Sequence, residues 1–274
     1  MGKGIVVILL ILAAVGCERE ARLDINARTA VIVNARTGRL IYKKNVNEKF
    51  PPASTSKIMT AIVAIENLAL DEKVIPSKNI TKVEPTAAPL NPGVEYVLKD
   101  LIYAMLVKSA NDAALAVAEG VSGSEVKFVE LMNEKARGIN MRNTYFANAS
   151  GLPTGIKDNQ YTTAEDLAKM MRYALRYGII LDAVSKKEEN IRGSDGKNIH
   201  LRTHNNTLFR EGGEAWGKTG YTKEAKRTFV GVDPSSEPKI IFALLQSDDL
   251  WNDIVKLKEY GLKASKRNRF LPFL

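Results

Sequence analysis

Hydrophobic residues near the two ends of the chain occur in the short, β-branched runs that are typical of strands. TAVIVNA (29–35) and RLIYKK (39–44) flank an RTG turn signal, so together they predict a β-hairpin. The β-rich pattern returns between residues 188 and 246, where AWGKTG, RTFVGV and KIIFALLQ are the clearest strands. Both ends of the chain are therefore expected to supply strands.

Between these segments the apolar residues recur at helical spacing. Ile58, Ile62, Ile65 and Leu68 mark a helix that follows a pair of prolines. A polar, proline-bearing stretch at 71–98 predicts short strands and loops. Further helices are expected near 99–108, 110–120, 124–138, 163–177 and 249–262.

This order of elements predicts an α+β fold. One antiparallel sheet would combine the N- and C-terminal strands, with flanking helices and a helical insert packed on one side. A cleft between the sheet and the insert is the natural place for a functional site. We expect residues 28–262 to form this domain, preceded by a tether at 18–27 and followed by a basic, apolar tail at 263–274.

Residues 1–17 differ from the rest of the chain. Lys3 precedes an apolar run at 4–15 that is too short to span a bilayer, which predicts a secretory signal. Cys17 ends this segment behind small residues, and the arrangement resembles the lipobox of bacterial lipoproteins, although that motif prefers leucine where Ala14 stands. The sequence thus predicts a protein exported to the extracytoplasmic face of a bacterial cell envelope and anchored to the membrane by lipid. An incidental cysteine after an ordinary signal is the alternative.

Composition and net charge indicate mainly which partners the surface of the protein can bind. The 274 residues are 45% hydrophobic and 26% charged, as in an ordinary globular protein, and the net charge is +9. Basic residues are scattered rather than grouped, so nucleic acid is not the expected partner, whereas an acidic cell-surface polymer or an anionic membrane fits this charge. The single cysteine excludes an internal disulfide.

The two histidines, His200 and His204, lie in IHLRTHNNTLF and fit no rival catalytic triad. We assign them structural or surface roles. Two histidines offer too few ligands for a metal centre when no cysteine lies near them, so neither a metal nor a cofactor is expected.

PPASTSKIMT (51–60) places Ser54 three residues before Lys57, where a helix should begin. The prolines favour a helix that starts just after them, which would put Ser54 in its first turn. Residues three apart share a helix face, so the hydroxyl and the amine can meet. Unpaired N–H groups at a helix start favour a developing oxyanion, and a desolvated lysine can accept the serine proton.

A Ser-x-x-Lys spacing is weak by itself, because it occurs at three other places in this chain. Two further motifs strengthen it. Ser109-Ala110-Asn111 lies at a junction between expected helices, and Lys218-Thr219-Gly220, followed by Tyr221, lies on an expected strand. These three motifs occur together, in this order, in penicillin-interacting serine enzymes.

From about residue 27 to 262 the chain resembles the low-molecular-mass penicillin-binding proteins that act as D-alanyl-D-alanine carboxypeptidases. The resemblance is carried by PPASTSKIMTAIVAIE, LVKSANDAA, FANASGLP and GKTGYTKEA. Ala149 departs from the family where a proline is common, and Lys226 and Thr228 stand where a glycine and a cysteine are frequent. These departures affect loop shape or specificity more than the central chemistry.

The resemblance implies an acyl-enzyme mechanism on the terminal peptide bond of a peptidoglycan stem peptide. Ser54 would attack the carbonyl between the two terminal D-alanines, and Lys57 would accept its proton. Ser109 would relay a proton to the leaving amine, and Asn111 would hold Lys57 or the substrate amide. Water would then hydrolyse the acyl-enzyme, and β-lactam antibiotics would inhibit the enzyme.

The same resemblance assigns substrate binding to the Lys-Thr-Gly strand. Lys218 and Thr219 would bind the terminal carboxylate, since a cation and a hydroxyl side by side suit that anion. The backbone N–H groups of Ser54 and of Tyr221, which follows Gly220, would form the oxyanion hole.

Two other functions share these motifs. A β-lactamase of the commonest type activates water with a glutamate on the loop after the Ser109 block, but residues 139–163 contain no glutamate and only Asp158 as an acid. A penicillin sensor that is acylated and never turns over is the second alternative, although the sequence has no recognisable signalling segment.

Overall fold

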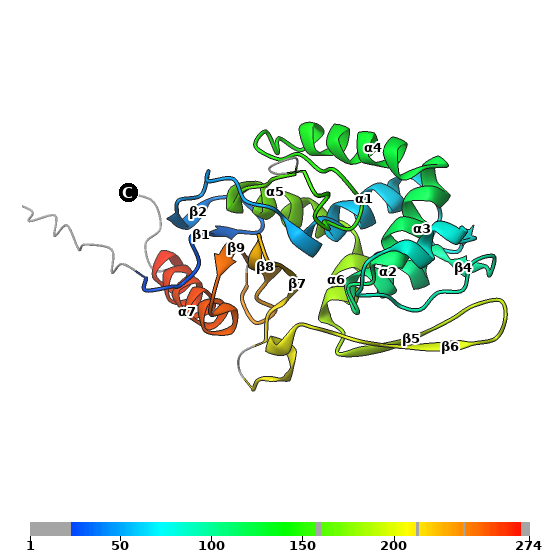
Figure 1. Ribbon diagram of the computed structural model, residues 1–274. Helices are drawn as coiled ribbons and strands as arrows, with labels where there is room; N and C mark the ends of the chain where they lie inside the picture. Colours follow the sequence, from blue (N-terminus) through cyan, green and yellow to red (C-terminus); the bar gives the residue numbers. More distant parts are fainter. Residues whose placement is uncertain (1–22, 157–159, 212–213, 238, 270–274) are drawn as a thin grey trace, which may run out of the picture.

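The computed structural model describes residues 23–156, 160–211, 214–237 and 239–269. Its centre is a five-stranded antiparallel sheet with the order β2-β1-β9-β8-β7. The strands are β1 (Thr29–Asn34), β2 (Leu40–Lys44), β7 (Trp216–Thr222), β8 (Lys226–Val232) and β9 (Ile240–Ser247). The first strand pairs directly with the last, Val31 opposite Ala243, so the two ends of the chain share one sheet (Figure 1).

Helices cover both faces of this sheet. On one face lie α1 (Lys57–Asn67) and α5 (Ala164–Ala174), which share the larger apolar core with the inward side chains of β1 and β9. On the other face lies α7 (Leu250–Arg269), whose Ile254 and Leu257 pack in a second core with Phe229 and Phe242. The inner strands β1, β8 and β9 are therefore buried on two sides, which explains their apolar runs, whereas the edge strand β2 is partly exposed.

The helical insert lies beside the sheet, at the end of the molecule away from α7 (Figure 1). It consists of α2 (Leu98–Leu106), α3 (Asn111–Ser122) and α4 (Glu125–Gly138), with the short strands β3 (Lys73–Val74) and β4 (Tyr96–Val97) and the turn η2 (Lys78–Lys82). Next to it, α6 (Gly178–Ser185) leads into the hairpin of β5 (Glu188–Arg192) and β6 (Asn198–Arg202) and then to η3 (Asn206–Phe209). The α+β architecture predicted from the sequence is confirmed.

Several boundaries differ from the sequence prediction. The helix expected at 163–177 ends at Ala174, and a separate helix, α6, follows from Gly178. The closing helix continues to Arg269, so residues 263–269 are helical rather than part of a tail. Ile25 and Ala27 are buried, and the N–H groups of Asn26 and Ala27 donate to the Asp253 carboxylate, so the domain begins before the expected end of the tether.

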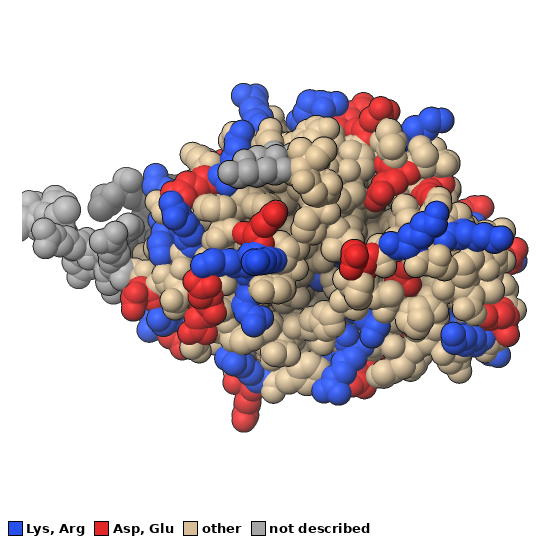
Figure 2. All heavy atoms as spheres, viewed as in Figure 1, with Lys and Arg blue, Asp and Glu red and all other residues tan. Residues whose placement is uncertain are grey.

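The proposed signal segment and Cys17 lie outside the described residues. Within the described part of the chain, no helix is long and apolar enough to cross a membrane. On the face in Figure 2, Lys and Arg side chains alternate with Asp and Glu, so positive charge does not form a continuous track on that face.

Candidate active site

The predicted nucleophile lies on a 3-10 turn rather than on an α-helix. This turn, η1 (Ala53–Ser56), directly precedes α1, whose first residue is Lys57. Pro52 stands at the N-cap of the turn, where its missing N–H group costs no hydrogen bond. Ser54 is half-buried, and its Oγ lies 3.0 Å from Lys57 Nζ. The sequence separation of three residues therefore brings the two groups together as expected, although the turn that carries Ser54 is a 3-10 turn, which is tighter than a turn of α-helix.

Lys57 is fully buried and has two further oxygen partners. Its Nζ donates to Asn111 Oδ1 at 2.6 Å and to the Ser150 carbonyl at 2.7 Å. Burial, and after it the nearby charge of Lys218, lower the pKa of Lys57 well below its ordinary value, while Asp112 opposes them. The site thus favours a neutral amine beside the serine hydroxyl.

Asn111 opens α3 and connects this helix to the loop at residues 84–90. Its backbone N–H donates to the Thr86 carbonyl at 2.7 Å, and its Nδ2 donates to the Glu84 carbonyl at 2.9 Å. The buried Asp112 carboxylate accepts the N–H groups of Ala88 and Leu90 in the same loop. Asp112 therefore anchors the loop at α3. The sequence analysis missed this role, although an acid in the first helical turn is a recognisable capping signal.

Ser109 lies in the short link between α2 and α3, and its backbone φ of 64° is in the left-handed region. A non-glycine residue in that region is uncommon and occurs where surrounding contacts hold it. Ser109 lines the same cavity as Ser54 and Thr219. This cavity has a volume of about 420 Å³. The structure thus places one residue from each of the three sequence motifs around one cavity.

Lys218 and Gly220 lie on the edge strand β7, next to η1. Lys218 is 2% exposed, its Nζ donates to the Thr219 carbonyl at 2.7 Å, and burial lowers its pKa to about 7. At Gly220, an added Cβ would lie 2.9 Å from Ser54 N and 2.4 Å from Thr228 Oγ1. A side chain at this position would displace the strand from the nucleophile, so the close approach requires glycine.

Six lining residues were not assigned to the site from the sequence: Pro85, Thr86, His204, Arg227, Leu250 and Trp251. His204 is an exposed residue of the cavity wall, and partial desolvation, then Lys218 and Lys108, lower the pKa of its imidazole. Arg227 lines the cavity from β8, and its guanidinium lies over the Tyr221 ring at 5.7 Å from the ring centroid. Trp251 contributes from the start of α7. Their sequence positions carry no motif, because only the folding of distant segments brings them to the cavity.

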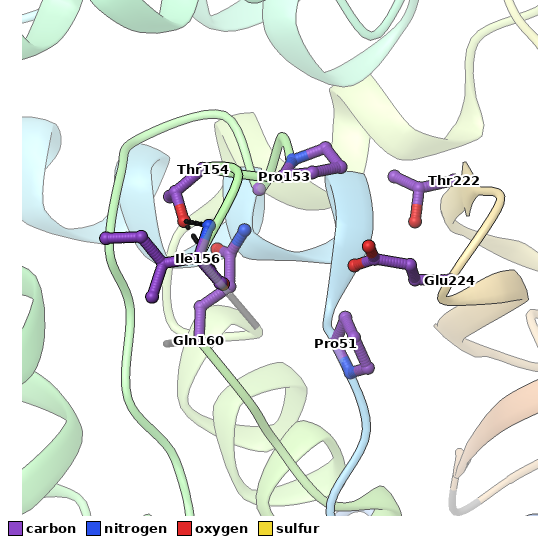
Figure 3. Close-up of a pocket in the computed structure, with 8 residues that line it drawn as sticks. Pro51, Pro153, Thr154, Ile156, Gln160, Thr222 and Glu224 are labelled. Atoms are coloured by element: carbon purple, nitrogen blue, oxygen red, sulfur yellow. Dashed lines mark hydrogen bonds between the residues drawn. The ribbon is translucent and has the colours of Figure 1, made fainter. Parts of the chain in front are cut away.

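A small recess adjoins the other side of the nucleophile turn (Figure 3). Gly151 lines this recess and also packs against the nucleophile turn η1. A Cβ at position 151 would lie within 3 Å of the Ala53 backbone and of Ser56 Oγ. The FANASGLP segment thus contacts the nucleophile turn and also supplies the Ser150 carbonyl to Lys57.

Comparisons with known proteins agree with this arrangement. The sequence model of the peptidase S11 family, described as D-alanyl-D-alanine carboxypeptidase, matches residues 16–249. The D-alanyl-D-alanine carboxypeptidase DacF of Bacillus subtilis is 35% identical over 214 residues, which are 76% of this chain and 54% of the relative. DacB2 of Mycobacterium tuberculosis is 29% identical over 241 residues, 86% of this chain and 82% of the relative. The chain therefore spans about half the length of the first relative and most of the second.

Solved structures show the same fold. The D-alanyl-D-alanine carboxypeptidase of Mycobacterium tuberculosis H37Rv superposes with a TM-score of 0.81 at 27% identity, over 88% of this chain and 92% of that one. The Streptomyces K15 DD-transpeptidase superposes with a TM-score of 0.80 at 27% identity, over 88% and 98% of the two chains. The extent of the family match, together with these relatives, shows that the chain belongs to the D-alanyl-D-alanine carboxypeptidase family, peptidase S11.

Proposed function

We propose that this protein is a serine D-alanyl-D-alanine carboxypeptidase that removes the terminal D-alanine from a peptidoglycan stem peptide through an acyl-enzyme. The observation that carries the proposal is the fully buried Lys57 amine, 3.0 Å from Ser54 Oγ, beside a cavity that Ser109 and Thr219 also line. Family membership supports the same reaction.

The hydrogen bonds of Lys57 support its role as the base. A neutral amine has two N–H donors and one lone pair. The two N–H groups match Asn111 Oδ1 and the Ser150 carbonyl, both of which only accept. The lone pair is then left for the Ser54 hydroxyl, so that this O–H donates to nitrogen and the proton can transfer as Oγ attacks the substrate carbonyl.

The oxyanion is assigned to the backbone beside Gly220. The close approach of β7 to Ser54 N leaves a narrow gap in which the Ser54 and Tyr221 N–H groups can both donate to the oxygen that becomes negative. The terminal carboxylate is assigned to Thr219 and Lys218. Arg227 lines the same cavity and adds a positive charge that is independent of pH, whereas the pKa of Lys218 is about 7.

Ser109 is assigned the relay of a proton: it gives its hydroxyl proton to the leaving D-alanine amine and takes back from Lys57 the proton that came from Ser54, so Lys57 is neutral again. It lines the same cavity as Ser54 and Thr219, and Asn111, two residues further along the chain, accepts a hydrogen bond from Lys57. After D-alanine leaves, a water takes its place, and Lys57 removes a proton from that water as it attacks the acyl carbonyl. The two half-reactions therefore use the same base.

The test compares Ser54→Ala with Ser194→Ala. Ser194 begins another Ser-x-x-Lys spacing, but it is exposed and donates no proton to a lysine. We expect Ser54→Ala to lose both labelling by a fluorescent penicillin and release of D-alanine from a pentapeptide, and Ser194→Ala to keep both. D-alanine release by Ser54→Ala would remove Ser54 as the nucleophile. Labelling without release in the wild type would instead support the penicillin-sensor alternative.

We propose, in addition, that the protein is exported and held at the membrane by a lipid on Cys17. The support is the apolar segment before Cys17 and a family that acts on the cell wall. Radiolabelled palmitate should enter the wild type but not Cys17→Ala expressed in a bacterium. Equal incorporation into both proteins would contradict the anchor.

A further inference from the structure

We infer that Glu125, at the start of α4, is a positioning residue for the base Lys57. It acts through the loop at residues 148–151, whose Ser150 carbonyl accepts a hydrogen bond from the lysine amine. This inference rests on the proposed carboxypeptidase reaction. It names a residue outside the three sequence motifs on which the rate of that reaction depends.

Glu125 is hydrogen-bonded directly to this loop. Its Oε1 accepts the N–H of Ala149 at 3.0 Å. Ala149 is fully buried and Glu125 is half-buried, and an ionised carboxylate accepts a stronger hydrogen bond than a neutral group does. A proline at position 149 would have no N–H group to donate, so the contact depends on the alanine. The bond therefore ties the loop to α4, a helix of the insert that packs on α1 (Figure 1).

The anchored N–H group lies one residue before the carbonyl that contacts the base. Because Ser150 follows Ala149 directly, at most about 7 Å of backbone separates the Ala149 nitrogen from the Ser150 carbonyl carbon. That carbonyl oxygen is 2.7 Å from Lys57 Nζ. A shift of the Ala149 N–H group therefore also moves the oxygen that holds the lysine amine.

Other contacts restrain the loop from the remaining directions. Thr60 on α1 donates its hydroxyl to the Ala149 carbonyl at 2.6 Å. Gly151 lies so close to the nucleophile turn that a Cβ at this position would collide with the Ala53 carbonyl. Contact with Ala53 limits movement of the loop toward the turn, and the hydrogen bonds with Thr60 and Glu125 limit movement away from it.

The insert thereby positions both acceptors of the Lys57 amine. Asn111, the first residue of α3, accepts one N–H group directly at 2.6 Å. Glu125, the first residue of α4, holds the other acceptor, the Ser150 carbonyl, through the loop. These two bonds direct the lone pair of the neutral amine toward Ser54, so a displaced carbonyl would misorient the base.

A purely structural role for Glu125 makes a different prediction. An acid in the first turn of a helix stabilises the helix through its negative charge. That effect depends on the charge of the side chain, whereas the bond to Ala149 depends on how far the accepting oxygen reaches. Substitutions that keep either the charge or the reach therefore separate the two roles.

The test measures the saturating rate constant of acylation by a fluorescent penicillin, together with the penicillin concentration that gives half of this rate. Glu125→Asp keeps the charge but is one methylene shorter, and Glu125→Gln keeps the reach of an accepting oxygen but loses the charge. We expect Glu125→Asp and Glu125→Ala to lower the rate constant about tenfold, because a slightly misplaced base reacts more slowly. Glu125→Gln should stay within about threefold of the wild type.

The half-saturating concentration should not change in any of these variants, because Glu125 is not among the described residues that line the active-site cavity. Glu130→Ala is the matched control: Glu130 is an exposed acid on the same helix, and its removal should change neither value. A first-order rate constant does not depend on the amount of folded protein, so a loss of stability alone would not imitate the expected result.

The outcomes are distinct. Rate constants that follow the charge, with Glu125→Asp like the wild type and Glu125→Gln slow, would overturn the inference. Wild-type rate constants in all three variants, or an effect on the half-saturating concentration alone, would overturn it as well. If Glu125→Ala does not fold, Glu125→Asp decides, since it keeps the acid that favours the start of α4. A wild type that penicillin does not acylate would contradict the proposed reaction itself.

Discussion

At the scale of single residues, the central feature is the charge state of Lys57. An ordinary lysine is a cation at neutral pH and could not accept a proton from serine. Full burial and the neighbouring Lys218 lower the pKa of Lys57, and the pair of acceptors on its N–H groups orients the lone pair. Three other segments of the chain, at Asn111, Ser150 and Lys218, thus favour the neutral form of this amine.

This leads to a prediction about pH. Because the reactive form of Lys57 is neutral, the rate of acylation by a fluorescent penicillin should fall as the pH falls through the lowered pKa of Lys57. Lys57→Arg, whose guanidinium stays protonated, should lose acylation by about a hundredfold or more at every pH. A flat pH profile in the wild type, together with a reactive Lys57→Arg, would contradict the assignment of Lys57 as the base.

Lys218 makes a second prediction, which concerns stability. Its pKa is about 7 in the folded chain and near 10.5 when exposed, so between these values the unfolded chain binds a proton that the folded chain does not. The contribution of Lys218 to the free energy of unfolding therefore rises with pH across this window, with a slope of up to about 1.4 kcal/mol per pH unit.

The measurement is urea unfolding of the wild type and of Lys218→Met between pH 6 and pH 10. Lys218→Met lacks the buried amine. Its free energy of unfolding should therefore exceed that of the wild type by the largest amount near pH 7, and this difference should shrink as the pH rises. A difference in the free energy of unfolding that does not change with pH would show that burial of the Lys218 amine does not destabilise the folded chain in this way.

At the scale of elements, the site depends on how closely β7 approaches the turn η1. Gly220→Ala would place a Cβ 2.4 Å from Thr228 Oγ1 and 2.9 Å from Ser54 N. We expect this change to lower the free energy of unfolding by about 1–3 kcal/mol and to slow penicillin acylation, because the strand must move away from Ser54.

Gly138→Ala is the matched control for this change. Gly138 lies in α4, and an added Cβ there meets nothing within 4 Å. The control should raise the free energy of unfolding by about 0.5–1 kcal/mol through helix propensity and leave acylation unchanged. A Gly220→Ala protein with wild-type acylation would show that the close approach is not needed.

Periodicity located most elements but not all of their ends. The helix from Lys57 and the strands β7, β8 and β9 follow directly from apolar spacing. The helix α6 was missed because its short apolar sequence, GIILDAVS, has no polar face to mark a helical period. The 3-10 form of η1 was missed as well; its first residue, Ala53, has a backbone φ of 47°, in the left-handed region that local propensity does not predict for alanine.

At the scale of the whole molecule, the sheet unites segments from both ends of the chain. Asp253 on α7 reinforces this link, since its carboxylate accepts the N–H groups of Asn26 and Ala27 and the Ser247 hydroxyl, with donor–acceptor distances of 2.7 Å each. The residue is fully buried. The start of the domain, the last strand and the last helix therefore depend on one carboxylate.

Asp253→Ala should lower the free energy of unfolding by about 3 kcal/mol, because three donors, two of them buried, lose a charged acceptor. Asp248→Ala is the control: Asp248 is 70% exposed and, among the described residues, pairs only with Lys226, so its removal should cost about 1 kcal/mol or less. Chemical denaturation of both variants measures the difference, and equal losses would contradict the proposed role of Asp253.

The sequence by itself determined the order of strands and helices apart from α6, the α+β class that this order implies, and the pairing of Ser54 with Lys57, because local spacing carries these features. Only the tertiary structure decided the charge of Lys57, the loop anchored by Asp112 and the cavity positions of His204 and Arg227. The physical reason is that burial and Coulomb interactions depend on distances in space, and these residues come from segments far apart along the chain.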